Sequence, residues 1–307
     1  MTDRPVRLAA LADLHCDRNC QGSLHALFES LAERADVVLL CGDLTHHGTV
    51  DEAGMLVREL APVRVPVLAV LGNHDHQSGV AGEVTRVLAD GGVRMLDGDT
   101  YELQGIGFAG VKGFCGGFGT RMLEPWGEAI IKRFVREAVE ETLKLESALS
   151  RIASEVRVVL THYAPIEATV VGEPLELYAY LGTSRLEEPL NRYRVAACFH
   201  GHAHHGTAEG RTSAGVPVYN VSMTLLHAQH PDRAPVRFVE IEAAAPAPAP
   251  AHGAPRDLGP VTRLPAAPQD ADGRAAAQPV HEPPAPERAP SERAMGPASG
   301  PGAPSSP

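Results

Sequence analysis

The feature that most constrains the fold is an alternation of strand-like and helix-like segments in which strand after strand ends in polar residues. Short apolar runs predict strands over 6–14, 36–44, 65–73, 156–163, 195–202, 216–222 and 236–242. The first five of these end in "DLH", "GDL", "GNHD", "TH" and "GHAH". In open α/β sheets, ligand sites form outside the carboxyl ends of the strands. The pattern therefore predicts an α/β domain with its chemistry along such an edge.

The chain divides into a folded part and a tail. Apolar residues at helical spacing predict helices over 23–35, 51–61, 82–92 and 127–150, and residues 94–113 have the pattern of short antiparallel strands. Beyond Glu242 the sequence becomes rich in proline and alanine and holds 16 of the 26 prolines. Such a segment buries too little apolar surface to offset the entropy of ordering it. We therefore expect one domain over 1–242 and a disordered tail over 243–307.

Charge and cysteine content restrict the partners and the compartment. The net charge is -11, almost all of it in residues 1–242, which opposes binding to nucleic acid or to an anionic membrane. No apolar run approaches the roughly 20 residues that span a bilayer, and the N-terminus lacks the pattern of a secretory signal. The five cysteines are scattered and odd in number, and Cys16 and Cys20 lack the C-x2-C spacing. We expect reduced thiols in a cytoplasmic protein.

The polar residues at the strand ends have the chemistry of metal ligands. Their oxygen and imidazole donors suit zinc, manganese, iron, cobalt or nickel. Any one of them alone is more simply explained as a satisfied polar residue, a helix cap or a turn former. Together they exceed one tetrahedral site and suit two ions that share a carboxylate. The candidate ligands are Asp13, His15, Asp43, Asn73, His162, His202 and His204.

The five motifs, in this order and each at a strand end, resemble the calcineurin-like metallophosphoesterase superfamily. The resemblance implies a four-layer α/β sandwich, in which two packed mixed sheets are flanked by helices. It also implies two metal ions, such as manganese, iron or zinc, with Asp43 bridging them. One ion would be held by Asp13, His15, Asp43 and His204, and the other by Asp43, Asn73, His162 and His202.

The resemblance further implies a reaction. A metal-bound hydroxide would attack a phosphate ester in line, with His74 contacting the phosphate and assisting the leaving group, and Asp75 orienting His74. Phosphodiesters of small molecules are the first choice of substrate, because "GDLTHHG" and "GNHD" resemble small bacterial phosphodiesterases. A phosphomonoesterase, a DNA nuclease and a non-catalytic scaffold are the alternatives. The acidic domain argues against the nuclease, and the full set of ligands argues against the scaffold. Oligomeric state is left open.

Several other residues near the motifs have ordinary explanations that we prefer. We expect His46, His47 and His76 to be polar loop residues, His200 to be structural, and His205 to be exposed. Cys16 is expected to be a packed thiol and Arg18 a solvated loop residue. The glycine-rich stretch 113–129 predicts a mobile segment near the site. Its Trp126 is expected to anchor the helix over 127–150 by packing, with stacking on substrate as the alternative.

Overall fold

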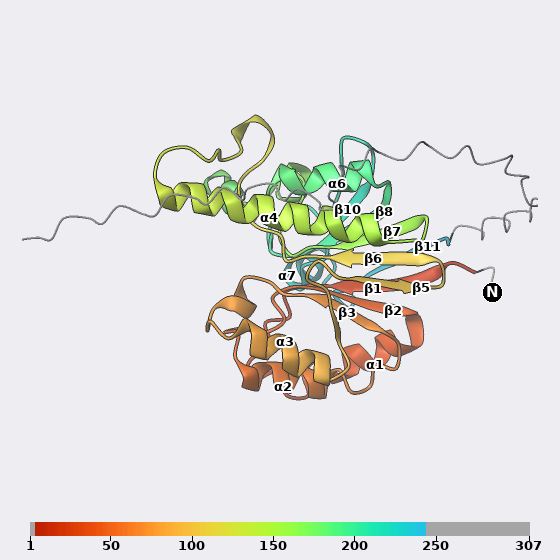
Figure 1. The fold of residues 1–307 in the computed structure, drawn as a ribbon. Coiled ribbons are helices and arrows are strands. Elements are labelled where there is room, and N and C mark those ends of the chain that lie inside the picture. The colour runs from red at the N-terminus through yellow and green to blue at the C-terminus, as the bar shows by residue number, and fades with distance from the viewer. Residues whose placement is uncertain (1–3, 244–307) are drawn as a thin grey trace, which may run out of the picture. The chain divides into compact units, whose positions relative to one another are not determined.

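Two β-sheets pack face to face in the computed structural model, which describes residues 4–243 (Figure 1). The first has the order β11 (Arg237–Ile241), β1 (Val6–Leu11), β2 (Val37–Cys41), β3 (Val67–Val70), β4 (Arg94–Met95). The second has the order β5 (Thr100–Leu103), β6 (Ile106–Gly110), β7 (Val156–Leu160), β8 (Val195–His200), β10 (Pro217–Asn220), β9 (Glu209–Arg211). Most neighbours run parallel, but β11, β5 and β9 pair antiparallel with β1, β6 and β10. Both sheets are therefore mixed.

Helices cover the outer face of each sheet, which confirms the predicted four-layer α/β sandwich. Below the first sheet in Figure 1 lie α1 (His25–Arg34), α2 (Val50–Glu59) and α3 (Ala81–Asp90), and above the second lie α4 (Ala129–Arg151) and α6 (Glu187–Arg192). The short helices α5 (Tyr178–Leu181) and α7 (Met223–Gln229) belong to connections around the strands. No helix within residues 4–243 combines the length and apolar composition needed to cross a membrane.

Strand β2 illustrates how the sequence builds these layers. All five of its residues are buried, because a central parallel strand is covered on both faces. Val37, Leu39 and Cys41 belong to the core between the two sheets. Val38 and Leu40 point the other way and pack in the core beneath α1, α2 and α3. The alternation of side chains along an extended strand thus divides one apolar run between two cores.

Helix α2 begins where the sequence provides a capping box. The side chain of Thr49 accepts a hydrogen bond from the backbone N–H of Glu52, and the Glu52 carboxylate accepts one from the N–H of Thr49. Two donors that the first helical turn leaves unpaired are thereby satisfied. This fixed start places the loop after β2 against the first turn of the helix.

The predicted elements agree with the structure except over 94–113. Residues of that stretch do form the antiparallel pair β5–β6, but β4 pairs in parallel with β3 of the first sheet. The segment therefore crosses from one sheet to the other. Its pattern of short strands carries no information about which sheet each strand joins. The tail predicted over 243–307 lies, apart from its first residue, outside the described residues.

Candidate metal centre

The carboxyl ends of five strands, from both sheets, supply the candidate ligands. Asp13 and His15 follow β1, Asp43 follows β2 and Asn73 follows β3, whereas His162 follows β7 and two histidines follow β8. Parallel strands end at the same edge of a sheet, so the two facing sheets bring these side chains together. The structure places all seven predicted ligands in one cluster.

The cluster contains three groups that could each hold an ion. Two of them are made of predicted ligands, and the third consists of His15, His46 and His74. In the first, ligand atoms of Asp13, His15 and His204 all lie within 4.8 Å of one another. In the second, the same holds for Asp43, His162 and His202.

Asp43 faces both groups of predicted ligands. Its Oδ2 atom lies 3.8 Å from Nε2 of His15, and its Oδ1 atom lies 3.4 Å from Nε2 of His162. Asn73 joins the second group, because its Oδ1 atom lies 2.9 Å from the same His162 nitrogen. One carboxylate thus spans the gap between two sets of ligands.

The backbone at these positions is strained. Asp13, His15, Asp43 and His202 have positive φ angles of 59°, 44°, 48° and 71°, and only two other non-glycine residues within 4–243 do. Such a left-handed conformation costs a non-glycine residue on the order of 1 kcal/mol. Strain of this kind persists where the surrounding structure enforces it, and it gathers at functional sites.

Two glycines permit the close approach of the ligand loops. A Cβ atom on Gly72 would lie 2.2 Å from Oδ1 of Asp43, and one on Gly42 would lie 2.4 Å from Nδ1 of His162. Any larger residue would displace a ligand. This is the physical reason for glycine in "GD" and "GNHD".

The electrostatics of the cluster favour a bound cation. Burial raises the pKa of Asp43, and the nearby charge of Asp13 raises it further. Burial is also the largest single influence on Asp13 and acts in the same direction, but the contacts with His204, His162 and Ser222 together outweigh it and lower the pKa of Asp13. Burial lowers the pKa of His15 and of His202 to about 4, so both rings are unprotonated near neutral pH.

The donor set fits divalent transition ions. Within residues 4–243 neither Asp13 nor Asp43 forms an ion pair with lysine or arginine. Buried carboxylates without a cation are costly, and unprotonated imidazoles beside them are good ligands. In addition, Nδ1 of His15 is buried without a hydrogen-bond partner.

His74 lies at the edge of the cluster. Its backbone N–H donates to Oδ1 of Asp43 at 2.8 Å, and its ring centroid is 4.5 Å from that of His15. Its Nδ1 atom lies 2.7 Å from the carbonyl oxygen of His46. A carbonyl oxygen only accepts, so Nδ1 carries the proton and Nε2 is the nitrogen left for a ligand or substrate.

The contacts of Asp75 differ from the prediction that it orients His74. Its buried carboxylate accepts hydrogen bonds from the N–H groups of Leu44, Thr45 and Gly72 and from the Thr45 hydroxyl, but not from the His74 ring. The carbonyl of His46 takes the predicted place. Asp75 instead joins the loops after β2 and β3. Residues 74–76 form a 3-10 turn, η1 (His74–His76), which directs neighbouring side chains to different sides.

The prediction of five reduced cysteines is wrong for two of them. Cys16 and Cys20 form a disulfide, with their Cα atoms 5.1 Å apart, whereas Cys41, Cys115 and Cys198 are free and buried. The prediction of a cytoplasmic protein was based partly on reduced cysteines. The disulfide between Cys16 and Cys20 does not support that part of the argument.

Sequence reasoning underestimated His46. Its ring offers a nitrogen within 4.8 Å of those of His15 and His74, so it belongs to the site. The signal was its place three residues after Asp43, on the same loop.

His200 is structural as expected, since its ring is buried and pairs with the Gly201 carbonyl and the Thr169 hydroxyl. Trp126 is 76% exposed, so the prediction that it anchors a helix by packing is wrong.

Comparison with known proteins agrees with this geometry. Residues 6–206 match the calcineurin-like phosphoesterases. The chain belongs to this family. The family is one of hydrolases that act on phosphate esters with divalent metal ions, and the protein is accordingly an enzyme of that class.

Two relatives illustrate how far the similarity extends. A probable cyclic nucleotide phosphodiesterase of Vesicomyosocius okutanii subsp. Calyptogena okutanii (strain HA) is 28% identical over 89 residues, which are 26% of this chain and 38% of the relative. The phosphopantetheinyl hydrolase of Mycobacterium tuberculosis has a similar structure, with a TM-score of 0.57 at 16% identity over 81% of this chain and 100% of its own. At that identity the structural match shows a shared fold.

Proposed function

We propose that this phosphoesterase hydrolyses small phosphodiesters with two divalent ions, such as manganese, iron or zinc, held by the seven predicted ligands. The observation that carries the proposal is the position of Asp43, whose two oxygens face different ligand groups. Bound ions would neutralise charge on the phosphate and activate water for attack. A carboxylate whose two oxygens face different ligand groups suits two ions that share it.

The protein's own residues supply proton transfer and positioning. With Nδ1 of His74 donating to the His46 carbonyl, a protonated ring can donate from Nε2 to the leaving oxygen. The backbone N–H of His74 ties the ring to Asp43, so the proton donor and the shared ligand keep a fixed relation. Asp75 acts as a positioning residue, because it fixes the loops that carry Asp43 and His74.

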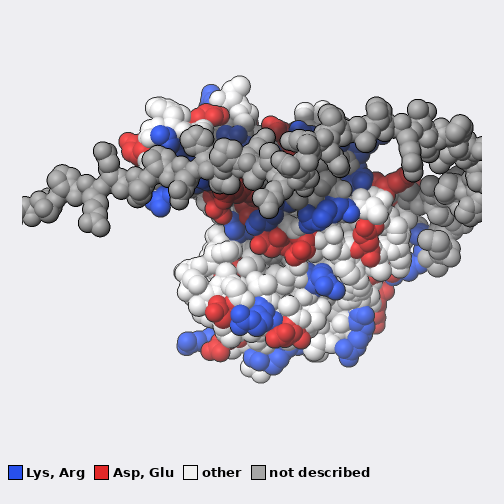
Figure 2. Space-filling view, in the orientation of Figure 1, with Lys and Arg blue, Asp and Glu red and all other residues white. Residues whose placement is uncertain are grey.

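The negative net charge of the chain favours small diesters over nucleic acid. Its similarity to a protein named as a phosphodiesterase favours diesters over monoesters. The net charge is -11, and Figure 2 shows acidic and basic residues interspersed on the part of the face that the grey atoms leave visible. The relative from Vesicomyosocius okutanii is named as a phosphodiesterase. Both observations support a small diester as the substrate of this chain.

A substrate panel tests the proposal. The full chain, supplied with manganese, is assayed with bis(p-nitrophenyl) phosphate, p-nitrophenyl phosphate and cyclic nucleotides. We expect kcat/KM for the diester to exceed that for the monoester by about tenfold or more. A preference for the monoester would make the protein a phosphatase. Inactivity on every substrate together with less than one bound ion per chain would overturn the enzyme proposal.

A further inference from the structure

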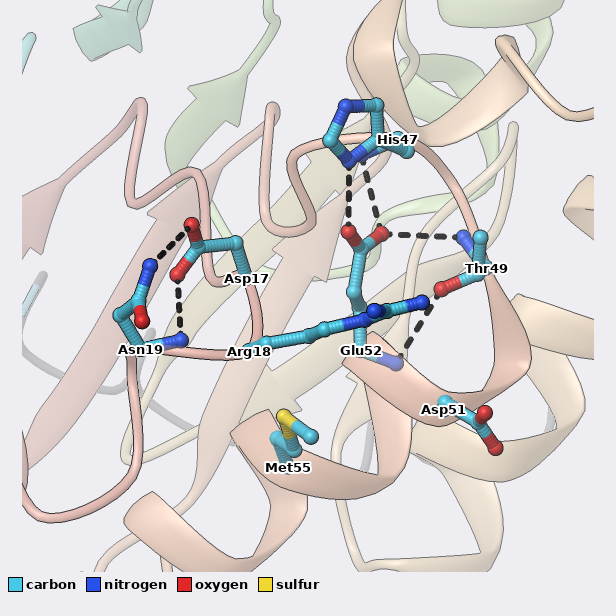
Figure 3. A pocket seen from close by; sticks show the side chains of 8 residues that line it. All are labelled: Asp17, Arg18, Asn19, His47, Thr49, Asp51, Glu52 and Met55. Carbon is cyan, nitrogen blue, oxygen red and sulfur yellow. Dashed lines mark hydrogen bonds and ion pairs between the residues drawn. The ribbon is translucent and has the colours of Figure 1, made fainter.

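A cavity of about 850 Å³ opens beside the candidate metal centre (Figure 3). One wall is the loop 17–19 between β1 and α1. The other is formed by His47 and the start of α2 as far as Met55. The side chain of Arg18 extends from the loop toward the first turn of α2. No role in the proposed chemistry uses these residues.

The ring of His46 lies between the cavity and the candidate ligand His15. The ring centroids of His46 and His47 are 4.4 Å apart, and those of His46 and His15 are 5.5 Å apart. On the opposite wall, Asp17 follows His15 by two residues. A group attached to a phosphate at the metal centre can therefore pass His46 and enter the cavity.

The walls are held in place before any ligand binds. The disulfide between Cys16 and Cys20 brackets the loop, and the Asp17 carboxylate accepts hydrogen bonds from the backbone and side-chain N–H groups of Asn19 at 2.8 and 3.1 Å. On the other side, the buried Glu52 carboxylate lies 2.9 Å from both the backbone nitrogen and Nδ1 of His47. Preformed walls reduce the ordering cost of binding.

The lining chemistry suits a flat, uncharged group with amino donors. The side chain of His47 is 55% exposed. Arg18 is exposed and forms no ion pair within residues 4–243. Imidazole and guanidinium planes both stack on aromatic rings, and the thioether of Met55 adapts to them. The carboxylates of Asp17 and Asp51 can accept hydrogen bonds from amino groups.

The same lining disfavours a second anionic group. Three carboxylates, those of Asp17, Asp51 and Glu52, line the cavity together with one guanidinium. A second phosphate on the substrate would meet this excess of negative charge. We propose that the cavity receives the uncharged aromatic arm of the phosphodiester, of the nucleobase type, stacked against Arg18 and His47. The inference rests on the proposed diesterase function and specifies its substrate class.

Two diesters with the same leaving group separate the arm from the chemistry. The p-nitrophenyl ester of adenosine 5′-monophosphate carries a nucleobase, whereas methyl p-nitrophenyl phosphate has no second aromatic arm.

Two variants alter the cavity: Arg18→Ala removes a stacking surface and Met55→Trp fills the cavity. We expect each to raise the KM for the adenosine diester about tenfold. The kcat/KM for the methyl diester should stay within about twofold. Arg233→Ala, at another exposed arginine that forms no ion pair within residues 4–243, is the matched control and should change neither.

A binding experiment keeps this inference separate from the proposed function. Adenosine 5′-monophosphate and ribose 5-phosphate are titrated by calorimetry into the manganese-treated full chain. We expect the nucleotide to bind about tenfold more tightly, with the difference lost in Arg18→Ala and Met55→Trp. Inactivity on both diesters would overturn the proposed function, and the titration would still decide the cavity. Equal affinities for the two probes, or equal effects of the variants on both diesters, would overturn the assignment of the cavity.

Discussion

The ring of His74 is oriented by a main-chain oxygen, since its Nδ1 atom lies 2.7 Å from the carbonyl of His46. A carbonyl fixes which nitrogen carries the proton without adding a charge beside the site. The position of that carbonyl depends on the loop after β2. The backbone N–H of His46 donates to the carbonyl of Cys16 at 3.1 Å, so this loop is tied to the one that carries His15.

Replacing His74 by alanine should separate catalysis from metal binding. The ring would donate a proton to the leaving oxygen, so its loss should lower kcat by about 10²- to 10⁴-fold. Metal content, measured by mass spectrometry of the purified protein, should stay at the wild-type value. His205→Ala, at an exposed residue, serves as the control. Loss of metal in His74→Ala would show that His74 is itself a ligand.

Replacing Asp75 by asparagine should destabilise the fold. The buried carboxylate accepts four hydrogen bonds from two loops, and an amide nitrogen would oppose a donor with another donor. The free energy of unfolding should fall by about 2 kcal/mol, as urea denaturation would measure. Asp232→Asn, at an exposed position, should have no such effect. An unchanged stability would contradict the structural role of Asp75.

Reducing the disulfide between Cys16 and Cys20 should also lower stability. The bond closes a loop of about five residues, for which the chain-entropy estimate is about 2 kcal/mol. A phosphine reductant should therefore lower the melting temperature of the wild type. The double variant Cys16→Ser with Cys20→Ser should melt at the lower temperature with or without reductant. A wild type whose melting temperature does not change with the reductant would contradict a stabilising role for the bond.

The stability contributed by Asp36 should depend on pH. Hydrogen bonds from the Arg4 side chain, and then from Arg7, lower the pKa of Asp36 below its ordinary value of 3.8. The ionised carboxylate therefore stabilises the fold above pH 3.8, and this contribution is lost as the pH falls toward the lowered pKa. Asp36→Asn should be less stable than the wild type at pH 6, and the difference should shrink below pH 4. A difference that stays constant between the two pH values would refute the role of the two arginines.

The grouping of the candidate ligands was predictable because their positions follow from topology. Asp13, Asp43 and His162 come directly after buried strands, and such strands are recognisable as short apolar runs. Parallel strands then end at a common edge, whatever the details of the loops. The left-handed backbone at Asp13 and Asp43 could not be foreseen, because aspartate adopts it more often than most non-glycine residues but still only in a small share of cases.

The contacts that were missed depend on loop geometry. The family resemblance implied that Asp75 orients His74, but in the turn that holds both residues the Asp75 carboxylate contacts Leu44, Thr45 and Gly72 instead. The spacing of Cys16 and Cys20 matches no common motif, and only the folded loop brings the sulfur atoms together. His46 could be placed on the right loop but not in the right orientation. Side-chain direction in an irregular segment is not set by a sequence period.

The proposal that Asp43 is shared by two ions is best tested by metal stoichiometry. The wild type and Asp43→Asn are dialysed against manganese, freed of excess ion, and analysed for metal per chain alongside their diesterase activity. We predict two ions per chain in the wild type, with loss of bound metal and of activity in Asp43→Asn. One ion per chain in the wild type, or unchanged metal content in the variant, would contradict a centre built around Asp43.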